Sequence, residues 1–176
     1  WVGVFVFPLT AAQQRRKNKN PHPTSPTPLR GAGEESKREE SEMPGRLAGK
    51  VALVIGAGSS GPGWGNGKAT SVLFAREGAK VFAVDRVLSA MEETAKIIAE
   101  EKGECRSFQA DVIQADQVEA MVQACIAAYG RIDVLHNNVG TAITGGPVEQ
   151  SEADWDKVMD VNVKSMFLTC KHVLPQ

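Results

Sequence analysis

The sequence predicts an α/β fold, in which a parallel sheet is covered by helices. From Lys50 onward, short apolar runs typical of strands alternate with segments of helical periodicity, and the connections are short. The first apolar run passes through a glycine-rich turn directly into a helical segment. The length of 176 residues allows one domain of ordinary size, so we expect a single α/β domain over residues 44–176.

Four strands and four helices are expected in alternation. The strands cover residues 51–55, 80–84, 106–110 and 132–136, and the helices residues 66–77, 89–101, 115–129 and 152–174. Glycine at every second position of 63–67 would cost a helix about 1 kcal/mol each, so the first helix is expected to begin only at Asn66, which can cap it. Further glycines end the first three helices, at Gly78, Gly103 and Gly130.

Residues 1–43 differ from the rest in composition. They hold five of the nine prolines and seven of the twenty Lys and Arg residues, and no helical or strand period persists through them. The apolar run 1–9 is far below the roughly 20 residues that a membrane helix requires, and the glutamates of 34–42 argue against a transit peptide, although organellar targeting stays open. We expect a disordered tail. Because Met43 directly precedes the domain, our hypothesis is that translation naturally starts there and that the tail is spurious upstream sequence.

Charge and cysteine content narrow the classes of function. The net charge of -1 gives no sign of a nucleic-acid partner, and no segment is long and apolar enough to indicate a membrane partner. Cys105, Cys125 and Cys170 form no C-x-x-C pair, and an odd number fits no closed set of disulfides. We expect three core cysteines in a reducing compartment, the cytoplasm, and no metal site.

The turn after the first strand carries the clearest sign of a binding site. Gly56, Gly58 and Gly61 match the spacing G-x-G-x-x-G between a strand and a helix. Glycine is needed there because the backbone must approach a pyrophosphate with no Cβ in the way, while the first free N–H groups of the helix face the anion. The turn predicts a dinucleotide phosphate cradle, although by itself it also fits a flexible surface loop.

An acidic residue, Asp85, follows the second strand. A dinucleotide-binding fold places there the acid that accepts hydrogen bonds from the adenosine ribose hydroxyls. Such a carboxylate repels a 2′-phosphate, which favours NAD over NADP as the cofactor. The neighbouring guanidinium of Arg86 can hold that phosphate, so NADP stays as the alternative.

Further motifs resemble those of a known family. The glycine turn and Asp85 are followed by Asp111-Val112 after the third strand, Asn137-Asn138-Val139-Gly140 after the fourth, and Asp160-Val161-Asn162-Val163 in the last helix. Together and in this order, they resemble the N-terminal half of a short-chain dehydrogenase/reductase, over residues 47–176. The resemblance implies a Rossmann-type doubly wound parallel sheet, here truncated after about four strands, and a nicotinamide cofactor.

The resemblance also implies a role for each motif. Asp111 would accept a hydrogen bond from the exocyclic amine of the adenine, and residues 137–140 would stabilise the central sheet and line the cofactor channel. Asn162 is the one predicted catalytic residue, because it would hold a water in the proton relay to the catalytic lysine. The predicted cofactor-binding residues are Gly56, Gly58, Ser59, Gly65, Asn66, Gly67, Asp85, Arg86, Asp111, Val112, Asn137, Asn138, Val139 and Gly140.

Two departures from the family pattern bear on function. The family places its first and last motif glycines closer together than Gly56 and Gly67, which are eleven apart. The longer loop, with Trp64, is similar to that of the enoyl-acyl-carrier-protein reductases, which we keep as a minor alternative. The catalytic serine and the Tyr-x-x-x-Lys motif of the family are missing, because Tyr129, the one tyrosine, has no lysine four residues on.

Three interpretations of function stay open. In the first, the full-length protein is an NAD-linked, homo-oligomeric oxidoreductase that transfers a hydride between the nicotinamide and a carbonyl or alcohol substrate. In the second, the chain binds the cofactor or a partner subunit and catalyses nothing. In the third, the product does not fold stably, because the fourth strand would be an unpaired edge and the last helix would expose Val161, Met166 and Phe167.

Overall fold

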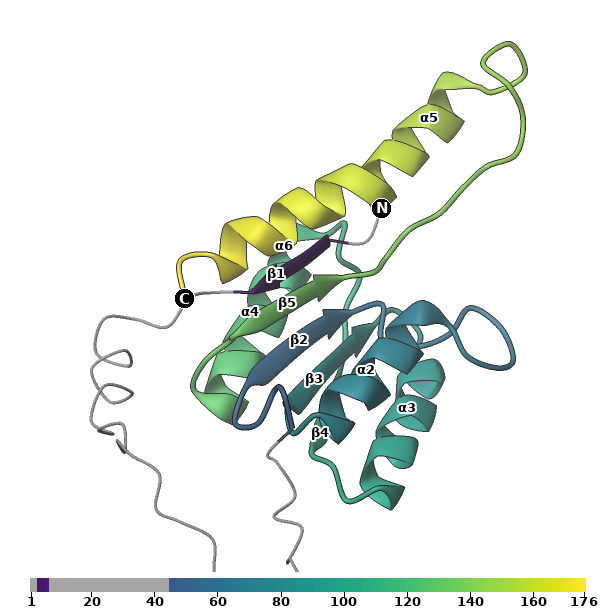
Figure 1. Ribbon diagram of the computed structural model, residues 1–176. Coiled ribbons are helices and arrows are strands. Elements are labelled where there is room, and N and C mark those ends of the chain that lie inside the picture. Colours follow the sequence, from purple (N-terminus) through teal and green to yellow (C-terminus); the bar gives the residue numbers. More distant parts are fainter. Residues whose placement is uncertain (1–2, 7–44) are drawn as a thin grey trace, which may run out of the picture. The chain divides into compact units, whose positions relative to one another are not determined.

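A computed structural model describes the backbone of residues 3–6 and all atoms of residues 45–176 (Figure 1). Four parallel strands were expected, and four are present: β2 (Val51–Ile55), β3 (Lys80–Asp85), β4 (Cys105–Gln109) and β5 (Val134–Asn137). The order in the sheet is β1-β5-β2-β3-β4, so β3 and β5 lie on opposite sides of β2. The chain thus reverses its direction of winding at β2, as in a doubly wound sheet.

Helices cover both faces of this sheet. The helices that follow β2 and β3 pack on one face, whereas those that follow β4 and β5 pack on the other (Figure 1). The first pair is α2 (Asn66–Arg76) and α3 (Leu88–Glu100), and the second is α4 (Ala115–Tyr129) and α6 (Ser165–Val173). The predicted α/β architecture with a Rossmann-type sheet is therefore confirmed.

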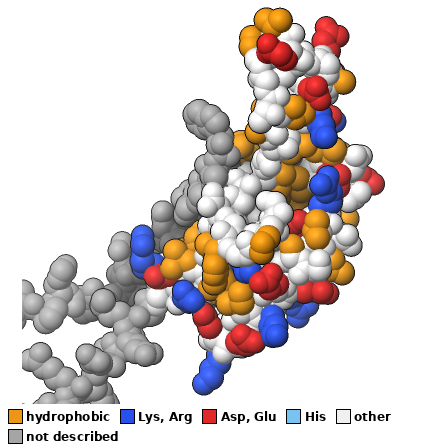
Figure 2. All heavy atoms as spheres, turned by 90° about the vertical axis from the view of Figure 1, so that its right-hand side faces the viewer, with side chains coloured by type: hydrophobic (Ala, Val, Ile, Leu, Met, Phe, Trp, Pro, Cys, Tyr) orange, Lys and Arg blue, Asp and Glu red, His pale blue; other side chains and the backbone are white. Residues whose placement is uncertain are grey.

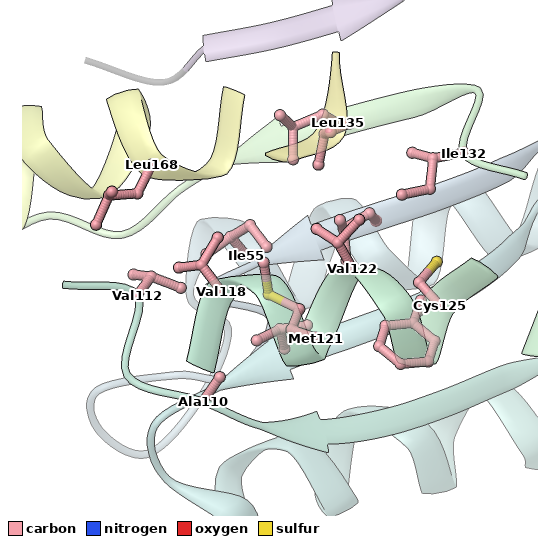
Figure 3. Packing of buried hydrophobic residues seen from close by; sticks show 14 of the residues in the cluster. Ile55, Ala110, Val112, Val118, Met121, Val122, Cys125, Ile132, Leu135 and Leu168 are labelled. Carbon is pink, nitrogen blue, oxygen red and sulfur yellow. The ribbon is translucent and has the colours of Figure 1, made fainter. Parts of the chain in front are cut away.

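The buried strand β2 contributes side chains to the hydrophobic clusters on both faces of the sheet. All five of its residues are buried, as expected of a parallel strand that is covered on both faces. Leu53 and Ile55 pack with α4 and α6, while Ala52 and Val54 pack with α2 and α3. Figure 3 shows Ile55 among side chains of the first cluster, near the labelled Val118 of α4. This packing fixes the end of β2, from which the glycine turn departs.

The outer edge of β5 is occupied by a strand that the sequence did not predict. β1 (Gly3–Val6) pairs with β5 in antiparallel orientation, with Gly3 opposite Asn137 and Val6 opposite Val134. The expected disorder is wrong for these four residues, and so is the expected unpaired edge. The physical reason is that the open edge of β5 presents unpaired N–H and C=O groups, and the valine-rich run 3–6 readily adopts a strand. The rest of the predicted tail, residues 1–2 and 7–43, lies outside the described residues.

The N-terminal cap of α2 differs from the predicted one. The helix begins at Asn66 as expected, but Gly65 is its N-cap and no side chain caps it. The asparagine therefore does not supply the predicted cap. The uncapped first turn leaves backbone N–H groups free to face an anion.

The last helical region contains a turn of different pitch. It comprises α5 (Glu152–Met159), a π-helical turn η1 (Asp160–Lys164) and α6. Ser151 caps its start, because its side chain accepts a hydrogen bond from the backbone N–H of Asp154 at 3.1 Å. Phe167 is exposed as predicted, whereas Val161 and Met166 are half-buried, contrary to expectation. The outward face exposes Trp155, Met159, Val163, Phe167 and Leu174.

The prediction that all three cysteines are core residues is confirmed only in part. Cys125 is buried, but Cys105 and Cys170 are half-buried, and all three are free thiols. Within residues 45–176, no group of His, Cys, Asp and Glu side chains has the arrangement of a metal site. The described helices include none that is long and apolar enough to cross a membrane.

Candidate cofactor site

A cavity of about 610 Å³ lies at the carboxyl ends of the parallel strands. Segments that follow β2, β3, β4 and β5 line it, so it lies where the order of the strands reverses. In open α/β sheets, ligands bind in the crevice at such a point. Figure 2 views the molecule from this side, and positive and negative side chains are interspersed on the face that it shows.

Twelve of the fourteen predicted cofactor-binding residues line this cavity. They are Gly56, Gly58, Ser59, Gly65, Asn66, Asp85, Arg86, Asp111, Val112, Asn138, Val139 and Gly140. Gly67 and Asn137 lie behind the surface of the cavity and are buried. The structure thus brings together residues that are up to 84 positions apart in the sequence, but their role in binding stays a prediction.

The glycine turn is held closed by a contact that only glycine allows. Gly56 has a φ of +76°, and a Cβ on Gly67 would lie 1.7 Å from the carbonyl oxygen of Gly56. The side-chain amide of Asn138 donates a hydrogen bond to that same carbonyl oxygen at 3.1 Å. The start of α2, the end of β2 and the end of β5 therefore meet at one backbone group.

The carboxylate of Asp85 is oriented by two backbone groups. One oxygen accepts a hydrogen bond from the N–H of Gly58 at 3.0 Å, and the other from the N–H of Val87 at 3.0 Å. A Cβ on Gly58 would lie 2.7 Å from the Cβ of Ala90 and 3.0 Å from the carboxylate, so glycine is required here as well. Each carboxylate oxygen has a second lone pair that can accept from a ribose hydroxyl.

Hydrogen bonds of Asp111 hold the turn that follows β4. Asp111 accepts a hydrogen bond from the N–H of Ile113 at 3.2 Å, and its own N–H donates to the side chain of Gln117 at 2.8 Å. This turn carries Val112 and Ile113 to the wall of the cavity. The wall here is apolar with an adjacent carboxylate, and the adenine-binding role of this turn stays a prediction.

Three of the four asparagines of the predicted site, Asn137, Asn138 and Asn162, have different partners. Asn138 holds the glycine turn, as described above, whereas Asn137 is buried and accepts a hydrogen bond from the hydroxyl of Thr169 at 2.8 Å. Asn137 therefore joins β5 to α6, and it does not line the cavity. The side chain of Asn162 accepts from the N–H of Thr141 at 2.7 Å and donates to its carbonyl oxygen at 2.8 Å. It thus anchors the segment that follows β5, and its relay role stays a prediction.

A second hollow of about 630 Å³ adjoins the first. It shares Val139, Gly140 and Thr141 with the cofactor cavity, and Asn162 and Met166 complete its wall from the helical side. Its lining is mostly apolar. Two adjoining hollows with a common wall are suited to a cofactor and a second small molecule.

The one tyrosine of the sequence lies elsewhere. The hydroxyl of Tyr129 donates a long hydrogen bond to the carbonyl oxygen of Val81 at 3.4 Å, and its ring packs against Phe82. Burial, followed by the effect of the Glu104 carboxylate, raises the pKa of Tyr129 to about 12. It lines neither hollow, and the expectation that it is not the catalytic acid stays a prediction.

Sequence reasoning missed several residues of the cavity wall. Ile113 and Thr141 each lie next to a predicted motif. Lys157 and Val161 come from the helical region and are four residues apart, so they share one face. The signal that could have found Lys157 is this i,i+4 relation to Val161, which belongs to a recognised motif.

Comparison with known proteins identifies the family. Residues 50–176 match the model of the short chain dehydrogenase family, so the chain belongs to that family. The chain is 39% identical over 130 residues to the 3-oxoacyl-(acyl-carrier-protein) reductase of Thermotoga maritima, covering 74% of this chain and 51% of that protein. It is 39% identical over 128 residues to the D-threitol dehydrogenase of Mycolicibacterium smegmatis, covering 73% and 47%. The chain thus spans about half the length of these curated relatives, in their N-terminal portion.

Solved structures give the same assignment. A short-chain dehydrogenase/reductase structure from Burkholderia xenovorans superposes with a TM-score of 0.73 at 49% identity, covering 74% of this chain and 52% of that one. A metagenomic short-chain oxidoreductase in complex with NADP superposes with a TM-score of 0.67 at 32% identity, covering 73% and 57%. The family binds nicotinamide dinucleotides, with either form of the cofactor.

Proposed function

We propose that residues 44–176 bind the adenosine diphosphate part of a nicotinamide dinucleotide, in a protein that is an NAD-dependent oxidoreductase when complete. The observation that carries this proposal is the cavity at the reversal point of the sheet, which gathers twelve predicted residues from four motifs. Its glycine turn leaves room for a pyrophosphate, its carboxylate suits a ribose, and its apolar turn suits an adenine.

We favour NAD over NADP because of the carboxylate at the ribose end. Asp85 faces the cavity with both oxygens fixed by backbone N–H groups, so it cannot turn away from a 2′-phosphate without losing two hydrogen bonds. Arg86 lines the same cavity and would offset part of the repulsion. NADP therefore remains a weaker ligand in this proposal.

Titration calorimetry of the whole chain with NAD and with NADP tests this site. The variant Asp85→Asn keeps one acceptor oxygen and removes the charge. We expect the affinity ratio of NAD to NADP to fall about 10-fold, which corresponds to about 1.4 kcal/mol. The matched control is Asp116→Asn in the first turn of α4, which should leave the ratio unchanged. A wild-type chain that binds neither dinucleotide would refute the proposed function.

The reaction that we propose for the complete protein is hydride transfer between the nicotinamide and a carbonyl or alcohol carbon. The bound nicotinamide would supply or accept the hydride. This chain's own residues would orient it, since Val139 and Gly140 form the wall between the two hollows. The relatives, a 3-oxoacyl-(acyl-carrier-protein) reductase and a D-threitol dehydrogenase, support a carbonyl or alcohol substrate.

A second candidate function is cofactor binding without chemistry in this chain. The observation that favours it is the position of Tyr129, which lies away from both hollows. An assay of NADH oxidation distinguishes the two candidate functions. It follows the absorbance at 340 nm in the presence of ketones or 3-ketoacyl thioesters. Turnover by this chain would exclude the second candidate, whereas calorimetric binding without turnover would support it.

We also propose that the protein forms a homo-oligomer through the exposed apolar face of α5, η1 and α6. This face carries Trp155 and Phe167, with 60% and 61% of each side chain exposed. Exposed apolar area of this kind marks an interaction surface. Sedimentation velocity should give a dimer or tetramer, and Phe167→Glu should shift it to the monomer. We place the protein in the cytoplasm, consistent with its free thiols, and cell fractionation tests this.

A further inference from the structure

The lengthened glycine turn contains an exposed excursion. It leaves the cavity wall after Ser60 and returns at Gly65, and residues 61–64 between them are exposed. Figure 1 shows this loop projecting between β2 and α2. Its two ends are close together, because a Cβ on Gly65 would lie 3.2 Å from the hydroxyl of Ser59.

One buried lysine contacts this excursion. The side chain of Lys68 is 3% exposed, and its ammonium donates to a carboxylate oxygen of Glu93 at 2.6 Å and to the carbonyl oxygen of Gly63 at 3.3 Å. The same ammonium lies 5.4 Å from the centre of the Trp64 ring, within the range of a cation–π interaction. A single charge thus joins the loop, α2 and α3.

The position of Lys68 is unfavourable for the helix itself. It is the third residue of α2, where the helix dipole disfavours a cation. Burial adds a desolvation cost, which is offset only when the charge is paired and hydrogen-bonded. Packing of α2 on the sheet needs no charge at this position, and the contacts that offset the cost are the ion pair with Glu93 and the two contacts to the loop.

We propose that Lys68 is a positioning residue that holds the excursion in one conformation and thereby preorganises the wall of the cofactor cavity. The carbonyl of Gly63 and the ring of Trp64 lie just before Gly65 and Asn66, which line the cavity. Fixing the loop there lowers the entropy that pyrophosphate binding must remove. Its effect on the cofactor rests on the proposed function, whereas its effect on the loop does not.

Two measurements on the full chain separate these effects. The first is the rate at which chymotrypsin cleaves the bond between Trp64 and Gly65 without ligand, followed by mass spectrometry, and the second is calorimetry with ADP-ribose and with adenosine. The variant Lys68→Met keeps the volume of the stem and removes the charge. We expect cleavage at this bond to quicken about 10-fold. The affinity for ADP-ribose should fall about 5-fold, while that for adenosine, which lacks the pyrophosphate, changes less than 2-fold.

Two further variants keep the test decisive. Lys96→Met removes an exposed lysine of α3, which pairs with Glu100, and should change neither measurement. Glu93→Gln weakens the pairing from the exposed side, so it reports on the same contact if Lys68→Met does not fold. It should give a smaller increase in the rate of cleavage at the Trp64–Gly65 bond.

The outcomes are distinct. Unchanged cleavage at the Trp64–Gly65 bond in Lys68→Met, or in Glu93→Gln if the first variant is unfolded, would overturn the inference. If cleavage quickens but ADP-ribose affinity is unchanged, the link to the cofactor is overturned. If the wild type binds no dinucleotide, the proposed function fails, and the cleavage rate alone decides whether Lys68 holds the loop.

Discussion

Replacing Gly67 by alanine should damage the fold at the point where the glycine turn closes. The added Cβ would lie 1.7 Å from the carbonyl oxygen of Gly56, whereas ordinary Cβ contacts are not closer than 3.0 Å. The start of α2 must therefore move away from β2 by about 1.3 Å. Asn138, which donates to the same carbonyl, cannot keep its hydrogen bond if that group moves.

The free energy of unfolding should fall by about 2 kcal/mol. Forcing a methyl group into a packed contact costs about 1–3 kcal/mol, and the lost hydrogen bond of Asn138 adds about 1 kcal/mol. Against this, alanine in place of glycine within a helix contributes about 1 kcal/mol of stability. For a domain of this size the net loss lowers the Tm by about 8 °C.

Differential scanning calorimetry measures this change directly. The matched control is Gly61→Ala in the same loop, where an added Cβ meets nothing within 4 Å and the backbone is not left-handed. The control should melt within about 1 °C of the wild type, since it makes no new contact. If Gly67→Ala and Gly61→Ala have the same Tm, the close approach of the two backbones is not the reason that glycine is required at position 67.

Three further predictions concern other parts of the domain. Burial lowers the pKa of His136 below its unfolded value of about 6.5. The free energy of unfolding should therefore keep its full value above about pH 6.5 and decrease below it. Urea melts of His136→Leu should show a weaker decrease. Asp133→Asn should cost about 2 kcal/mol in urea unfolding, because the buried carboxylate accepts from Val51 N–H at 2.9 Å and pairs with neighbouring cations; a loss below about 0.5 kcal/mol would contradict this. Asn162→Ala should speed hydrogen exchange at the amide of Thr141, and unchanged exchange would show that another contact protects this amide.

The parallel strands and their helices could be predicted because each is encoded locally. The apolar run of β2 and the glycine after α4 are visible in a short window, and Gly130 does adopt the left-handed conformation at the helix end. The boundary of β5 is shifted from the prediction, beginning at Val134. The preceding Asp133 uses its side chain to bond the start of β2.

The features that were missed depend on contacts between distant segments. The pairing of β1 with β5 joins residues about 130 positions apart, and no periodic pattern in the local sequence predicts it. The burial of Lys68 depends on Glu93 in another helix, and Asn137 turns to Thr169 instead of the cavity. Residue types predicted the members of the candidate site well, because glycine and acid positions are set by steric and charge rules. They did not predict which asparagine faces the cavity.

The two side-chain bonds that join β2 to β5 have a consequence for the order of folding. Asp133 accepts from the start of β2 and Asn138 donates to its end, and each bond spans 82 residues of chain. Loops of that length close slowly, and β2, β3 and β4 with their helices are all synthesised before either bond can form. During synthesis, the wall of the cavity is therefore completed only after residue 161 has left the ribosome, so under the proposed function a nascent chain would gain dinucleotide affinity late.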